Sequence, residues 1–141
     1  MLRPYQPGDQ ADVLDVWFRA SSLAHPFLSA EFIARERAEI GDHWLEVADT
    51  TVYESDGRVV GSISLIGNEV GGIFVDPGHQ GQGIGRALMG HAEGTRPFLE
   101  LTVFAANTAA RRFYDRYGFE PVAETTHEET GQPQLRLRLD Y

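Results

Sequence analysis

A glycine-rich turn in the middle of the chain has the composition of a phosphate-binding site. Residues 77–86 read Pro-Gly-His-Gln-Gly-Gln-Gly-Ile-Gly-Arg, between an apolar strand candidate at 72–75 and a helix candidate with apolar residues at helical spacing. A turn that enters a helix presents unpaired backbone N–H groups at the positive end of the helix dipole, where phosphate oxygens bind. The turn therefore predicts a phosphorylated ligand, although some glycine-rich turns are tight turns and nothing more.

Two well-known phosphate-binding patterns do not fit this turn. The Walker pattern requires a lysine, and all 12 basic residues of the chain are arginine. The dinucleotide pattern Gly-x-Gly-x-x-Gly has a different spacing from residues 81–85, and it belongs early in a doubly wound sheet, whereas an antiparallel meander is predicted before this turn.

A third pattern fits, and a second motif accompanies it. Gln80-x-x-Gly83-x-Gly85, after the apolar run at 73–75, resembles the coenzyme A-binding motif of the GNAT superfamily of N-acetyltransferases. Downstream, residues 107–119 read Asn-x-x-Ala-x-x-Phe-Tyr-x-x-x-Gly-Phe, which is similar to another signature of that family at a family-like separation. The resemblance covers nearly the whole chain, and the segment 25–31 looks like a small bacterial subgroup, some of whose members act on protein lysines.

The resemblance implies an enzyme that binds acetyl-CoA as cosubstrate and transfers its acetyl group directly to a primary amine. The acceptor could be a protein lysine or N-terminus, a polyamine or another small amine. A strand pair that splays beside residues 73–75 would leave backbone groups free for the pantetheine arm. The implied cofactor-binding residues are Ile73, Phe74, Val75, Gln80, Gly81, Gln82, Gly83, Ile84, Gly85, Arg86 and Asn107.

Tyr114 is the candidate acid. Ala110, Phe113, Tyr114 and Tyr117 recur at helical spacing, which by itself predicts a buried helix face. The resemblance implies that Tyr114 protonates the departing thiolate, and a phenol with a pKa near 10 suits that step.

The general base is less clear. Many GNAT enzymes carry a glutamate five residues before the asparagine, but this position is Thr102, which is no base. Glu100 and Glu69 are the nearest carboxylates along the predicted strands, and either could order a water chain or simply be solvated. The missing glutamate also leaves open a non-catalytic acyl-CoA-binding module that acts as a regulator or sensor.

The turn between the first two helices is expected to border the acceptor pocket through His25 and Phe27. His25 and His79 are further candidates for the base. The formal charge of −9 favours a cationic acceptor and disfavours nucleic acid as a partner.

These residues must be positioned by short alternating elements. Asp56-Gly57 between two β-prone runs predicts a hairpin. Asn107 is a predicted helix cap, and Gly118 is a predicted helix stop. The predicted order is β-α-α-β-β-β-α-β-α-β-β. We expect an α/β (α+β) GNAT acyl-CoA N-acyltransferase fold, with a mixed central sheet of six to seven strands and four helices.

Length and composition limit the number of domains and the kinds of partner and cofactor that we expect. A chain of 141 residues is expected to form one domain over 1–141. No run of 18 apolar residues and no signal peptide are seen, so we expect no membrane partner. The absence of cysteine fits a cytoplasmic location and excludes a thiolate nucleophile. No histidine pair has metal-ligand spacing, so no metal is expected. The chain could be a monomer or a homodimer.

Overall fold

The computed structural model describes the whole chain, residues 1–141. The predicted order of elements is confirmed, with a short π-helical turn η2 (Ile40–Trp44) and a short helix α3 (Leu45–Val47) in addition. The strands are β1 (Leu2–Pro4), β2 (Asp49–Ser55), β3 (Arg58–Ile66), β4 (Glu69–Val75), β5 (Phe98–Phe104), β6 (Glu120–Thr126) and β7 (Pro133–Asp140). The main helices are α1 (Gln10–Ala24), α2 (Ala30–Glu39), α4 (Ile84–Glu93) and α5 (Thr108–Tyr117). No helix is long and apolar enough to span a bilayer.

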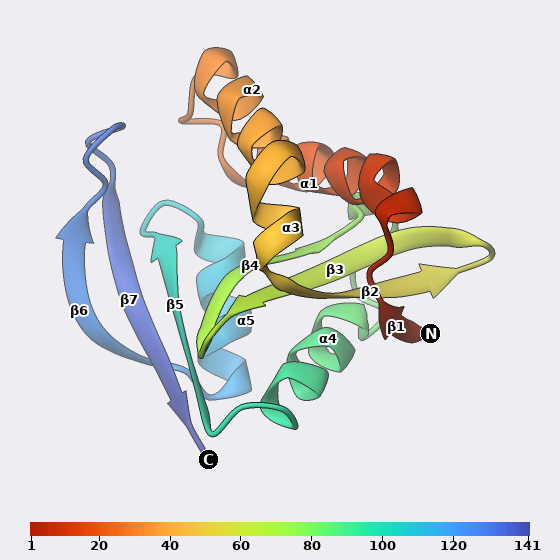
Figure 1. Cartoon of the computed structure of the whole chain (residues 1–141). Helices are drawn as coiled ribbons and strands as arrows, with labels where there is room; N and C mark the ends of the chain where they lie inside the picture. The colour runs from red at the N-terminus through yellow and green to blue at the C-terminus, as the bar shows by residue number, and fades with distance from the viewer.

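The seven strands form one mixed sheet in the order β1-β2-β3-β4-β5-β7-β6. Neighbouring strands are antiparallel except for β4 and β5, which are parallel because α4 connects them as a crossover. Figure 1 shows α1 and α2 on one side of the sheet and α4 and α5 on the other. Both faces of the sheet therefore carry helices, although β6 at the edge is exposed along its whole length, and the core lies in two layers.

The two core layers correspond to two clusters of buried apolar side chains. The larger cluster joins α4 and α5 to the sheet, and Leu88, Met89 and Leu99 in it are fully buried. The smaller one lies beneath α1 and α3. At Gly61 of β3, a Cβ would lie only 3.0 Å from Ile84, so α4 packs directly on the strand backbone there. This close contact fixes the start of α4, where the glycine-rich turn ends.

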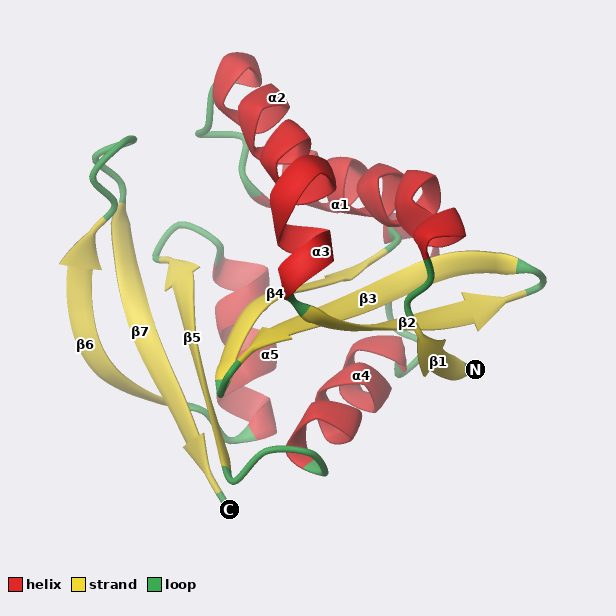
Figure 2. Ribbon diagram, in the orientation of Figure 1, coloured by secondary structure: helices red, strands yellow, loops and turns green.

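The sheet separates into two halves at the β4–β5 junction (Figure 2). Only one residue pair, Glu69 with Glu100, is in register there, and the Glu100 N–H donates to the Asn68 carbonyl at 2.9 Å. Beyond this pair the edge of β4 that faces β5 has no strand partner. The backbone groups that Ile73 to Val75 direct to this edge are thus left without a ladder.

The chain widens at the end of α2, where the regular helix changes at Ile40 into the π-helical turn η2. The Gln10 side-chain amide donates to the Gly41 carbonyl at 2.8 Å. Because a partner on α1 satisfies this carbonyl, the wider turn has no unpaired group at that point. A contact between segments 31 residues apart is not visible in local sequence patterns.

Candidate functional site

One large cavity, about 1280 Å³, occupies the space between the sheet halves. It is lined by residues from α1, α2, β4, β5, α5 and the glycine-rich turn. The structure brings together most of the residues that the sequence predicts for a site, namely His25, Glu69, Ile73, Phe74, Val75, Gln80, Gly81, Gly83, Ile84, Gly85, Arg86, Asn107 and Tyr114. Phe27, Gln82 and Glu100 are not among its lining residues.

The glycine-rich turn has a conformation that depends on glycine at two positions. Gly81 and Gly83 both have φ of 81°, in the left-handed region that side chains disfavour. Gly83 is the N-cap of α4, so the first N–H groups of that helix have no intrahelical acceptor. These N–H groups lie at the wall of the cavity, where they can bind an anion.

A buried ion pair attaches this turn to α1. The side chain of Asp76, which directly follows β4, is only 4% exposed. Both of its oxygens accept hydrogen bonds from Arg19 at 2.9 Å, and Oδ1 also accepts from the Gly78 N–H at 3.0 Å. Burial acts to raise the pKa of Asp76, but the Gly78 and Arg19 hydrogen bonds outweigh it and hold this pKa below its ordinary value.

Replacing Asp76 by asparagine is expected to lower the free energy of unfolding at pH 7 by about 1–3 kcal/mol. Because the folded-state pKa is depressed, the ion pair stabilises the fold above the unfolded-state value of 3.8 and loses this effect as the pH falls below it. Urea unfolding at pH 7, 5 and 3 should show that the difference from the wild type shrinks at pH 3. As a control, Asp15→Asn removes the exposed ion-pair partner of Arg19. It should lower the free energy of unfolding by less than about 0.5 kcal/mol.

Tyr114 lies on the α5 face that borders the cavity. Tyr114 is 9% exposed, and its ring packs edge-on against Phe113 and Phe119, with ring centroids 5.6 Å apart in each pair. No group of the protein forms a hydrogen bond with its hydroxyl. Burial raises the pKa of Tyr114 to about 12, so the phenol stays protonated at any physiological pH. The hydroxyl is therefore a free donor at the wall of the cavity.

The two candidate base carboxylates are held by arginines of β7. Arg136 donates to both oxygens of Glu69, at 2.7 and 2.6 Å, and to Glu100 at 2.8 Å. Arg138 binds the other oxygen of Glu100 at 2.8 Å. The hydrogen bond from Arg136 is the largest of the effects that lower the pKa of Glu100. Glu100 is thereby a weak proton acceptor, and of the two carboxylates only Glu69 lines the cavity.

His25 connects the α1–α2 turn to the start of α5. The Asn107 side-chain oxygen accepts from the Ala110 N–H at 3.3 Å, as expected of a helix cap, so its amide nitrogen is left to donate to His25 Nε2 at 3.2 Å. This places the imidazole proton on Nδ1. Burial lowers the pKa of His25, which favours this neutral ring. Phe27 packs on the His25 ring at 5.6 Å and so supports it from outside the cavity.

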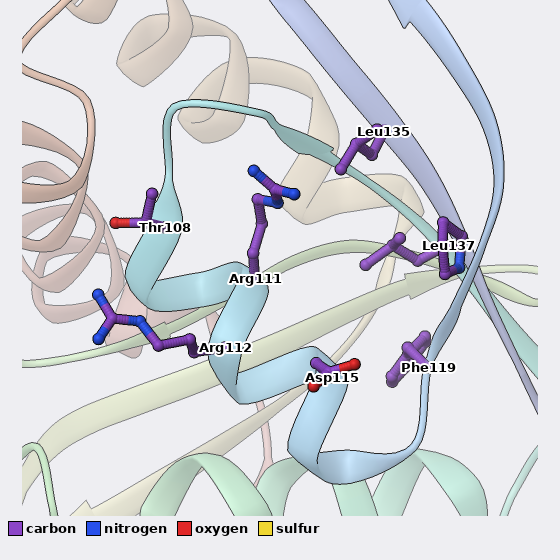
Figure 3. A pocket seen from close by; sticks show the side chains of 8 residues that line it. Thr108, Arg111, Arg112, Asp115, Phe119, Leu135 and Leu137 are labelled. Carbon is purple, nitrogen blue, oxygen red and sulfur yellow. The ribbon is translucent and has the colours of Figure 1, made fainter.

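A smaller cavity of about 370 Å³ lies on the opposite face of α5, against β6 and β7 (Figure 3). Thr108, Arg111, Arg112 and Asp115 border it from the helix, at helical spacing, and Leu135 and Leu137 border it from β7. None of the residues predicted for the site lies there. The two faces of α5 thus have separate environments, and the one with Tyr114 faces the large cavity.

Several residues of the large cavity carry no signal that the sequence reveals by itself. Phe32 and Glu36 come from α2, Phe104 from the end of β5, and His127 from the β6–β7 connection. Phe32 and Glu36 are one helical turn apart and could only be read as part of an amphipathic face. Their approach to His127 depends on the tertiary fold.

Comparison with protein families gives a match over more than half of the chain. Residues 44–121 match the family described as "Acetyltransferase (GNAT) domain". This range includes β2 to β5, the glycine-rich turn and all of α5.

Two curated relatives from Escherichia coli are similar over almost their full lengths. The chain is 31% identical to peptidyl-lysine N-acetyltransferase YiaC, with 94% of this chain and 92% of the relative covered. It is 33% identical to peptidyl-lysine N-acetyltransferase YjaB, with 99% and 95% covered.

Solved structures agree with this likeness. The solution structure of apo-form YjaB from Escherichia coli superposes with a TM-score of 0.88 at 27% identity, covering 99% of this chain and 96% of that one. The PaiA N-acetyltransferase of Thermoplasma acidophilum, solved with coenzyme A, shares the fold with a TM-score of 0.81 at 17% identity and coverage of 100% and 98%.

Proposed function

Because the chain belongs to the GNAT family of acetyltransferases, we propose that it transfers the acetyl group of acetyl-CoA to lysine side chains of proteins. The chain is an acyltransferase, and the family's cosubstrate is acetyl-CoA. Lysine as the acceptor is supported by the two relatives that are named peptidyl-lysine N-acetyltransferases. One observation carries the proposal: a single cavity joins the glycine-rich turn and Tyr114 to a pocket beside α2.

In this proposal the coenzyme occupies the half of the cavity next to α4 and α5. Backbone N–H groups of residues 80–86 bind the diphosphate, and Arg86 adds a positive charge at the same wall. The unpaired edge of β4 at Ile73 to Val75 binds the pantetheine arm. Asn107 contacts this arm at the start of α5.

The chemical step is a direct transfer. The neutral lysine nitrogen attacks the thioester carbonyl carbon and forms a tetrahedral intermediate, whose oxyanion is stabilised by a backbone N–H near Val75. The carbon–sulfur bond then breaks, and the electron pair stays on sulfur. The Tyr114 hydroxyl donates a hydrogen bond to this thiolate, while the nitrogen loses a proton to water. The chain has no cysteine for an acyl-enzyme.

The amine is proposed to lose its proton with the help of solvent. Glu100 does not line the cavity, and the lone pair of His25 Nε2 is occupied by Asn107. Glu69 can order a water molecule at the cavity wall but is held by Arg136. A lysine amine has an ordinary pKa of about 10.4, so the fraction of reactive neutral amine rises tenfold per pH unit below that value.

The test is acetylation of a synthetic lysine peptide with acetyl-CoA, followed by mass spectrometry. We expect product with a lysine peptide, none with the matching arginine peptide, and a kcat/KM that rises from pH 7 to pH 9. The enzyme has no lysine of its own, so it adds no acetyl-lysine signal. Tight coenzyme binding in calorimetry without any product would favour the non-catalytic alternative.

A further inference from the structure

Charged residues divide the large cavity into two ends. Four acidic or arginine residues line it: Glu36, Glu69, Arg86 and Arg116. The two arginines come from α4 and α5, on the side proposed for the coenzyme, and the two glutamates come from α2 and β4. Arg136 neutralises Glu69 through two hydrogen bonds. The Glu36 carboxylate has no hydrogen bond and no ion pair within the protein, so it is the uncompensated negative charge of the cavity.

A row of four aromatic rings separates Glu36 from Asn107. Phe32, one turn before Glu36 on the same face of α2, packs against His127 at a centroid distance of 5.7 Å. His127 packs against Phe104 at 5.3 Å, and Phe104 packs against His25 at 5.2 Å. His25 in turn bonds to Asn107, beside the proposed coenzyme arm. Glu36 therefore lies at the outer end of this row, away from the proposed reaction centre.

The surroundings of Glu36 leave its charge in need of a counter-ion. Burial raises the pKa of Glu36, and the nearby carboxylates of Glu39 and Glu129 raise it further. Arg35 and His127 act in the opposite direction, but Arg35 forms an ion pair with Glu129 at 2.5 Å. His127 Nδ1 accepts from the Thr130 N–H at 3.3 Å, so this nitrogen is bonded within its own turn and not to Glu36. The charged form of a half-buried carboxylate in such a position is stabilised most by a cation that a bound ligand brings into the cavity.

We infer that Glu36 binds a second positive charge of the acceptor, so that the preferred substrate is a peptide with a basic residue close to the target lysine. This inference rests on the proposed function. The reacting nitrogen must be neutral when it attacks, and a carboxylate beside it would stabilise the unreactive ammonium ion instead. The ring row keeps Glu36 apart from the reaction centre and gives the alkyl part of the peptide an apolar surface.

The test compares five peptides and three forms of the enzyme, namely the wild type, Glu36→Gln and Glu39→Gln, at 0.15 M salt. One peptide is a blocked pentapeptide with a central lysine and four alanines. The other peptides carry one arginine at each flanking position in turn, which adds charge but no second acetylation site. We expect the best arginine peptide to exceed the alanine peptide in kcat/KM about tenfold with the wild type, mainly through KM. Glu36→Gln should reduce this ratio to below about twofold.

Glu39→Gln is the matched control, because it removes the same charge from the same helix at an exposed position outside the cavity lining. The Glu39→Gln enzyme should keep the tenfold preference for the arginine peptide, and thermal unfolding should show that both variants are folded. If Glu36→Gln retains the tenfold ratio, or if Glu39→Gln loses it equally, the inference is wrong. Equal acetylation of all peptides by the wild type also overturns it but leaves the proposed function intact. Failure to acetylate any peptide overturns both.

Discussion

Replacing Tyr114 by phenylalanine is expected to lower kcat for acetyl transfer by roughly 100- to 1000-fold and to leave the Kd for acetyl-CoA almost unchanged. With a pKa of about 12, the buried phenol is a weaker acid than an ordinary thiol, whose pKa is about 8.5. Complete proton transfer to the thiolate would thus be uphill by roughly 5 kcal/mol. We therefore expect Tyr114 to act mainly by donating a strong hydrogen bond to the sulfur as negative charge develops there.

Tyr117→Phe is the control for this experiment, because it removes a hydroxyl from the same helix one turn later. The Tyr117 hydroxyl donates to Glu93 at 2.7 Å, and Tyr117 does not line the cavity. Its kcat should stay within about threefold of the wild type. A Tyr114→Phe enzyme that keeps full kcat, with product measured by mass spectrometry and coenzyme binding by calorimetry, would remove Tyr114 from the mechanism.

Replacing Gly83 by valine is expected to weaken acetyl-CoA binding by at least about 100-fold. At φ of 81° a β-branched residue is strained, and the strain is relieved by rotating peptide groups of the turn. Rotation redirects the N–H groups proposed to bind the diphosphate, and each lost hydrogen bond to a charged group costs about 1.5–3 kcal/mol. Isothermal titration with acetyl-CoA measures the effect directly.

Gly67→Val separates loss of binding from loss of stability. Gly67, in the turn between β3 and β4, also has positive φ, and a Cβ at either glycine meets no atom within 4 Å. The two variants should therefore lose similar unfolding free energy, but only Gly83→Val should lose affinity for the coenzyme. Comparable coenzyme affinity in both variants would mean that the turn does not bind the diphosphate.

Much of the fold was predictable because its signals are local. Asn107 caps α5 as predicted, through a hydrogen bond from the Ala110 N–H, and the predicted stop Gly118 directly follows the last residue of this helix. The Asp56-Gly57 turn predicted the hairpin of β2 and β3, and the helix candidate after the glycine-rich turn lies in the crossover between β4 and β5. The family membership predicted from two ordered motifs is confirmed by the match of residues 44–121 to the family and by the two relatives from Escherichia coli.

The rest depended on contacts between distant segments. The ion pairs of Glu69 and Glu100 come from Arg136, which is 67 and 36 residues away along the chain. The bond of His25 to Asn107 spans 82 residues. No local pattern distinguishes a free glutamate from one held by such partners. For the same reason Glu36 could not be recognised as the unpaired carboxylate, since only the packed fold shows which partners it lacks.

The single register pair between β4 and β5 has a mechanical consequence. The two halves of the sheet are joined between β4 and β5 by one register pair, and the Arg136 hydrogen bonds to Glu69 and Glu100 hold this junction from β7. Under the proposed function, the amide groups of the pantetheine arm would extend the ladder past the junction and make the sheet continuous. Acetyl-CoA would then connect the two halves of the sheet as well as donate the acetyl group. Each release of coenzyme A would remove this connection and leave the junction between β4 and β5 more flexible.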